Sequence, residues 1–301
     1  MRSEMVTGIL AGIREMIKPF ENANPEDIPA IRGAMPVPEE TPPLPPDVTV
    51  TETSANGVPA LWVQAEGTDP DIRFVRFHGG GYVLGGPGAD NTAPISREGN
   101  CVVLDVDYRL APEHTYPAAL EDALNAIQFA RENGPQGPST AKTIFVGGDS
   151  AGGGLALAAL IALRDEGAEL PSAAVTMSAW TDLSLSGTSM DERDSIDPML
   201  GRVHLDIWGR AYVGDADLTT PLASPLFADL TGLPPLLMQV GTDEVLFDDT
   251  IRVAEKAQEA GVSVRTEIYG GQHHVFQNMA ALIPEGNDAY ASIGAFLKRH
   301  A

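Results

Sequence analysis

A serine flanked by glycines stands between a predicted strand and a predicted helix, and this feature constrains the fold more than any other. Residues 147–153 read Gly-Gly-Asp-Ser-Ala-Gly-Gly, with Ser150 at the centre. A β-branched run, 143–146, precedes the stretch and an Ala/Leu-rich segment, 154–160, follows it. Gly-x-Ser-x-Gly between strand and helix is the pattern of a nucleophile elbow, a strained turn that exposes the serine hydroxyl. A Cβ on either flanking glycine would collide with a neighbouring strand or helix, so both positions need glycine.

The rest of the chain alternates between predicted strands and helices. An antiparallel hairpin comes first, because two short β-branched or apolar runs flank an Asn-Gly turn. Strands are expected at 48–53, 60–63, 72–77, 102–106, 143–146, 173–178, 236–240 and 264–269, and helices at 118–131, 154–160, 249–260 and 289–299. This order predicts an α/β fold: a mostly parallel, eight-stranded twisted sheet with helices on both faces.

Two segments break this alternation. Residues 1–46 are helical at first and then rich in proline, with no predicted strand. Residues 181–234 are irregular and partly helical, over 204–212. We expect the first segment to form an N-terminal helical cap and the second to add a cap insertion to a catalytic domain of 47–301.

The charge of the chain restricts its partners. The formal net charge is −23, with 42 Asp and Glu against 19 Lys and Arg. Such a surface repels nucleic acid and anionic membranes, so neither is an expected partner. No apolar run reaches the ~18 residues of a membrane span. A small-molecule substrate is the partner that remains.

The chain offers no expected cofactor or metal site. Cys101 is the single cysteine, which excludes an intramolecular disulfide and makes a cytoplasmic location the default. It heads an apolar run, so we interpret it as core. The adjacent pair His273 and His274 lacks zinc-ligand spacing, and there is no second cysteine to help.

An activated serine needs a base and an acid, and candidates follow the last two predicted strands. Asp243 comes after one strand, and His273 and His274 come after the other. The order serine, acid, histidine is the one expected on this sheet. Glu244 is the neighbouring alternative to Asp243, and we expect it to point elsewhere. Between the two histidines the local physics does not choose.

A glycine-rich loop after the third strand is the candidate oxyanion hole. Residues 78–81 read His-Gly-Gly-Gly. A backbone without side chains can approach a substrate closely and turn its N–H groups toward developing negative charge. We expect His78 to hold this loop by hydrogen bonding rather than to act as a second base, with Gly81 supporting the same loop.

Together these motifs resemble the hormone-sensitive-lipase family of bacterial esterases, an α/β-hydrolase family. The resemblance is carried by His-Gly-Gly-Gly-Tyr at 78–82, the elbow, and Tyr-Arg-Leu-Ala-Pro-Glu at 108–113. It implies Ser150 as nucleophile, Asp243 as acid and His274 as base. It also implies an oxyanion hole from the amides of Gly79, Gly80 and Ala151, and weakly a homodimer through the last strand. Asp-Pro-Met-Leu at 197–200 resembles a cap-proximal motif of part of the family.

The expected function is hydrolysis of short- to medium-chain carboxylic esters through an acyl-enzyme. One alternative is a lactone or other acyl hydrolase that uses the same triad. A more distant one is a binding protein that keeps the fold without turnover, but such proteins typically lack a triad member and none is missing here.

Overall fold

The computed structural model describes residues 3–36 and 44–301. An eight-stranded sheet in the order β1-β2-β4-β3-β7-β8-β9-β10 forms its centre. Its strands are β1 (Val48–Ala55), β2 (Val58–Ala65), β3 (Asp69–Phe77), β4 (Cys101–Val106), β7 (Thr143–Asp149), β8 (Ala173–Met177), β9 (Leu236–Gly241) and β10 (Val264–Tyr269). All eight expected strands are confirmed, with β1–β2 as the predicted hairpin and β3, β4, β7, β8, β9 and β10 parallel to one another. Two short strands, β5 (Asn133–Gly134) and β6 (Gly137–Pro138), pair with each other outside this sheet.

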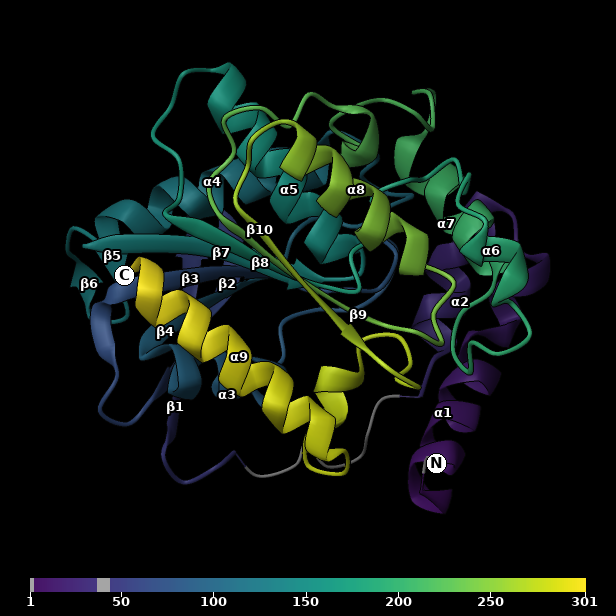
Figure 1. Cartoon of the computed structure of the whole chain (residues 1–301), viewed down its shortest axis with the longest axis horizontal. Helices are drawn as coiled ribbons and strands as arrows, with labels where there is room; N and C mark the ends of the chain where they lie inside the picture. Colours follow the sequence, from purple (N-terminus) through teal and green to yellow (C-terminus); the bar gives the residue numbers. More distant parts are fainter. Residues whose placement is uncertain (1–2, 37–43) are drawn as a thin grey trace.

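Helices cover both faces of the sheet, as expected (Figure 1). α4 and α5 pack together on one face, and α3 packs against α9 on the other. The helices are α1 (Glu4–Ile17), α2 (Ile28–Ala34), α3 (Ala89–Gly99), α4 (Ala118–Glu132), α5 (Ala151–Asp165), α6 (Ser189–Glu192), α7 (Arg202–Val213), α8 (Phe247–Glu259) and α9 (Pro284–His300). Short 3-10 turns lie at Lys18–Asn22 (η1), Pro25–Asp27 (η2), Pro225–Phe227 (η3) and Phe276–Met279 (η4).

The central strands are buried on both faces, which explains their near-continuous apolar sequences. Alternate residues of β7 divide between two cores: Val146 belongs to the core under α4 and α5, whereas Phe145 packs toward α9. Both faces of the sheet are therefore packed against core side chains. The loops at the carboxyl ends of its parallel strands share one edge of the sheet.

The N-terminal helices lie beside α7 (Figure 1). η1 and η2 contact α7, and Phe20 meets Trp208 edge to face with ring centroids 5.7 Å apart. The expected helix in the insertion 181–234 is confirmed as α7, and no strand occurs within those residues. Part of the expected proline-rich stretch, 37–43, lies outside the described residues.

Candidate active site

Ser150 occupies the strained turn that the sequence predicts. It connects β7 to α5 with φ +54° and ψ −123°, a conformation that L-residues rarely adopt. Two backbone hydrogen bonds to the loop after β8 hold it: its N–H donates to the Met177 carbonyl, and its own carbonyl accepts from Trp180 N, both at 2.9 Å. The side chain is buried to 5% exposure and lies at the amino end of α5.

The need for glycine on either side of this serine is confirmed. A Cβ on Gly148 would lie 2.3 Å from the Phe77 carbonyl oxygen, and one on Gly152 only 2.0 Å from it. Because Phe77 ends β3, the elbow packs directly against the strand that leads into the His-Gly-Gly-Gly loop. Any side chain at these two positions would therefore separate the serine from that loop.

His274 is the histidine that shares a cavity with Ser150. Both residues line a cavity of about 490 Å³, whereas the neighbouring His273 is fully buried and is not among the residues that line this cavity. His274 Nδ1 lies 2.9 Å from Glu244 Oε2. With a proton on Nδ1 donated to the carboxylate, Nε2 keeps its lone pair and can accept a proton.

The residue that contacts His274 Nδ1 is Glu244, the neighbouring alternative to Asp243. The Glu244 side chain is fully buried, and its Oε1 accepts from Gly241 N at 2.6 Å and from Ser178 Oγ at 2.8 Å. Asp243 instead lines a separate surface cavity and accepts from the Thr242 hydroxyl at 3.1 Å. Consecutive residues in this turn point in different directions, and nothing in the sequence indicates which of the two faces the histidine.

The balance of burial and charge raises the pKa of His274. Burial alone would lower the pKa, since it disfavours the imidazolium. The hydrogen bond and charge of Glu244 outweigh burial, with further contributions from Asp197 and Asp149, and the pKa lies above the ordinary 6.5. The site therefore stabilises the imidazolium that proton abstraction would create.

The glycine-rich loop differs from its expected role at one position. Gly79 N donates to Asp149 Oδ2 at 3.1 Å, so this amide, expected in the oxyanion hole, already has an acceptor. Gly80 and Gly81 line the cavity with Ser150 and have φ of +112° and +62°. Gly79 lines the same cavity, so all three glycines of the loop lie beside Ser150.

His78 holds the loop, as expected. Its Nδ1 lies 2.7 Å from the Gly79 carbonyl oxygen, and its carbonyl accepts from Tyr108 Oη at 2.7 Å. The imidazole stacks on the Tyr108 ring, with centroids 4.2 Å apart and planes 10° apart. Burial lowers the pKa of His78 to about 4, so it is neutral and donates from Nδ1.

A buried arginine that belongs to none of the sequence motifs joins the glycine-rich loop to the elbow. Arg76 on β3 lies 2.9 Å from Asp105 Oδ1 and 2.6 Å from Asp149 Oδ1. The other oxygen of Asp149 accepts from Gly79 N, and that of Asp105 accepts from Gly88 N at 2.7 Å. Alternation on β3 places Arg76 among apolar neighbours, so the pattern of the strand alone gives no signal for this ion pair.

The other wall of the cavity is mostly apolar and comes from the N-terminal helices and the segment 181–234. We call α1, α2 and α7 the cap helices, because Ile13 and Met16 of α1, Arg32 of α2 and Trp208 of α7 line the cavity above Ser150. A Cβ on Gly81 would lie 2.4 Å from the Trp208 ring, so the ring packs directly on the glycine loop.

Asp197 fastens this wall to the acid loop. Its Oδ1 accepts from Met199 N and Leu200 N, both at 2.9 Å, and both residues line the cavity. Its Oδ2 accepts from Val245 N at 3.0 Å, immediately after Glu244. Its carbonyl accepts from Arg14 Nη1 of α1 at 2.8 Å. The motif at 197–200 therefore connects α1 to the turn that contains Glu244.

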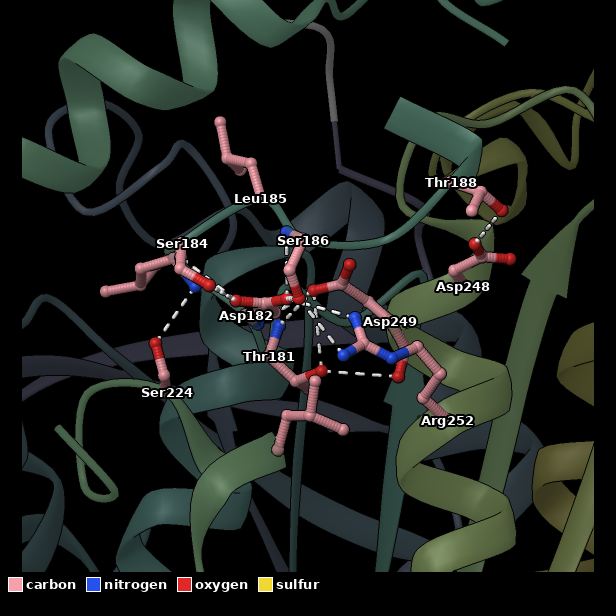
Figure 2. Close-up of polar contacts among 12 residues, drawn as sticks. Thr181, Asp182, Ser184, Leu185, Ser186, Thr188, Ser224, Asp248, Asp249 and Arg252 are labelled. Carbon is pink, nitrogen blue, oxygen red and sulfur yellow. Dashed lines mark hydrogen bonds and ion pairs between the residues drawn. The ribbon is translucent and has the colours of Figure 1, made fainter. Parts of the chain in front are cut away.

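A second buried cluster ties the start of α8 to the loop after β8 (Figure 2). Asp249 Oδ2 accepts from the amides of Thr181 and Asp182, at 2.7 and 2.8 Å. Asp182 in turn binds Arg252 Nη1 at 3.0 Å and the hydroxyls of Ser184 and Ser186, both at 2.5 Å. Because α8 follows directly on the Glu244 turn, this cluster fixes one end of the acid loop.

The described residues, 3–36 and 44–301, contain no group of three or more His, Cys, Asp or Glu that could hold a metal ion. Within the same residues, no helix is both long enough and apolar enough to cross a membrane.

Comparisons with known proteins place the chain in a family. The profile of a family described as having the alpha/beta hydrolase fold matches residues 74–278. The chain is 40% identical to an acetyl-hydrolase of Streptomyces hygroscopicus over 79% of each chain, and 34% identical to an esterase of Acinetobacter venetianus over 83% of this chain and 82% of the relative. It is also similar to the crystal structure of an esterase from the bacterial hormone-sensitive lipase family, with a TM-score of 0.84, 37% identity, and coverage of 100% of this chain and 99% of that one.

Proposed function

Because the chain belongs to the alpha/beta hydrolase fold family and is a carboxylic ester hydrolase like the bacterial hormone-sensitive-lipase esterases, we propose that it hydrolyses short- to medium-chain esters through an acyl-enzyme on Ser150. The observation that carries this proposal is the hydrogen bond from His274 Nδ1 to the buried Glu244 carboxylate, beside a serine on a strained elbow.

In the proposed reaction, His274 Nε2 removes the Ser150 proton as the hydroxyl oxygen attacks the ester carbonyl. Glu244 holds the imidazole in the tautomer that leaves Nε2 free, and its charge stabilises the imidazolium. The imidazolium then protonates the departing alkoxide. Water, deprotonated by His274, attacks the acyl-enzyme, and the acid leaves as Ser150 recovers its proton.

For the oxyanion we propose the amides of Gly80, Gly81 and Ala151. Gly79 is replaced because its N–H already donates to Asp149. Ala151 is the first residue of α5, where an N–H has no intrahelical acceptor and the positive end of the helix dipole adds to the field.

The finer features of the proposal concern organisation and location. We propose that 1–46 and 181–234 act as a cap over a catalytic domain of 47–301. Homodimerisation through β10 is supported by its place at the edge of the sheet and by Ile268, which is 52% exposed. A cytoplasmic location is supported by the single cysteine, Cys101, which is buried as a free thiol.

The experiment compares the wild type with Ser150→Ala on p-nitrophenyl butyrate. We expect the variant to lose roughly 10⁶-fold in turnover while its circular dichroism spectrum and melting temperature stay near those of the wild type. A fluorophosphonate should label the wild type and leave the variant unlabelled. Hydrolysis by Ser150→Ala at a rate near that of the wild type would exclude Ser150 as the nucleophile.

A further inference from the structure

Ser178 lies at the point where the three proposed catalytic segments meet, and none of the motifs in the sequence includes it. It directly follows β8 and is fully buried. Its Oγ donates to Glu244 Oε1 at 2.8 Å and accepts from Val275 N at 3.1 Å. One hydroxyl therefore connects the loop of the acid to the loop of the base.

The backbone around Ser178 holds the nucleophile as well. Met177 and Trp180, on either side of Ser178, make the two hydrogen bonds that hold Ser150 on its turn, at 2.9 Å each. Ser178 N itself donates to Gln239 O at 2.8 Å, which ties the segment to β9. Residues 177–180 thus contact all three segments on which the proposed mechanism depends.

Backbone strain gathers at the same place. Ser150, Ser178 and Val275 have φ of +54°, +52° and +49°, in a region that non-glycine residues rarely adopt. Val275 is β-branched, for which this conformation is especially unfavourable. Such strain persists only where surrounding contacts hold the backbone in place. Here one strained residue holds another, because the Ser178 hydroxyl accepts a hydrogen bond from Val275 N.

We propose that Ser178 is a positioning residue, whose hydroxyl orients the Glu244 carboxylate and the His274 loop relative to each other; this inference rests on the proposed function. The Ser178 hydroxyl donates to Glu244 Oε1, and the other carboxylate oxygen, Oε2, faces His274 Nδ1. The same hydroxyl fixes Val275 N, one residue beyond the imidazole. It touches neither substrate nor the reacting atoms.

Two variants separate this role from a role in folding alone. Ser178→Ala removes the hydroxyl and keeps a Cβ at positive φ, whereas Ser178→Gly removes the hydroxyl and relieves the strain. We expect Ser178→Gly to melt at a higher temperature than Ser178→Ala. We expect both to lose about 10²-fold in kcat with KM within about threefold, because small misplacements at a reacting centre have effects of this size.

The matched control is Thr176→Val, on β8 two residues before Ser178 and also buried. Within the described part of the chain, the Thr176 hydroxyl has no hydrogen-bond partner. Its removal should leave kcat within about twofold of the wild type.

Two further readouts would not respond to a purely structural role. The rate at which a fluorophosphonate labels Ser150 should fall in parallel with kcat in both Ser178 variants. The acidic limb of the kcat/KM profile should move to lower pH, because a carboxylate no longer held against His274 stabilises its imidazolium less.

The proposal is overturned if either Ser178 variant, folded at the assay temperature, keeps kcat within threefold of the wild type, or if the loss appears in KM. It is also overturned if activity falls only in proportion to the unfolded fraction. Failure of the proposed function would look different. A wild type that is labelled by the fluorophosphonate but does not hydrolyse esters would refute the esterase activity. The labelling rate of each Ser178 variant relative to the wild type would still test the role of Ser178.

Discussion

The two sides of the cavity are held together by different interactions, and we call the side that contains Ser150 the floor and the opposite wall the roof. The floor consists of loops after the parallel strands, where buried polar side chains are joined by hydrogen bonds of 2.6–3.1 Å, as between Arg76, Asp149 and Gly79. The roof consists of the cap helices, which present apolar side chains such as Ile13 and Met16. Directional bonds fix atoms to fractions of an ångström, whereas apolar contacts tolerate changes of shape. We infer that the floor determines the rate of the reaction and the roof determines which ester binds.

After the loss expected for Ser150→Ala, the largest effect should come from the acid on the floor. We expect Glu244→Gln to lower kcat about 10³–10⁴-fold, because an amide cannot stabilise the imidazolium and disturbs its tautomer. Asp243→Asn, a matched change at the neighbouring residue, should stay within about threefold of the wild type, since Asp243 faces another cavity. Steady-state kinetics on p-nitrophenyl butyrate measures both. The reverse pattern, with Asp243→Asn inactive and Glu244→Gln active, would restore Asp243 as the acid.

A smaller effect is expected in the pH dependence of activity, which reports on His274 in the floor. His274 must be neutral to act as base, and Glu244 raises its pKa above the ordinary 6.5 against the opposing effect of burial. Activity should therefore fall as pH drops through a value above 6.5, approaching tenfold per unit below it. The pH profile of kcat/KM on an uncharged ester measures this limb. A profile that is flat down to pH 4 would contradict the assignment of His274.

The smallest effect should come from the roof. Met16 lines the cavity from α1, whereas Met5 on the same helix is 63% exposed and lies away from it. We expect Met16→Ala to raise KM for p-nitrophenyl hexanoate about fivefold, since partial burial of a thioether side chain contributes roughly 1 kcal/mol. kcat should be unchanged, and Met5→Ala should change neither constant. A fall in kcat with unchanged KM in Met16→Ala would show that the two regions do not divide the work in this way.

The fold could be predicted almost completely from the sequence, because strand and helix periodicities are local. No pattern indicated α3, nor the short elements α6, β5 and β6, and α3 is the longest of these. Its sequence contains Pro94 and is polar on average, yet Ala93 and Ile95 pack with α9 in the core. Tertiary packing here overrides a weak local preference.

The site could be predicted in its position but not in every partner. Strand order brings the serine, acid and histidine loops to one edge, where Ser150 and His274 line one cavity. The direction of a side chain in a turn depends on contacts with distant segments, and Ser178 is 66 residues from Glu244. The choice between Asp243 and Glu244, and the acceptor of the Gly79 amide, were for that reason beyond the reach of local patterns.

The cluster in Figure 2 has a mechanical consequence for how a bulky ester is admitted. It anchors the start of α8, and with it the acid turn, to the body of the protein through Asp249 and Arg252. The N-terminal helices are attached instead by Arg14 and Arg32, each donating to main-chain carbonyls at 2.8 Å. Asp197, however, accepts from Arg14 of α1 and also from Val245 N beside Glu244, so a displacement of α1 that widened the entrance would act on the acid turn through this one residue, while the cluster holds the other end of the turn in place.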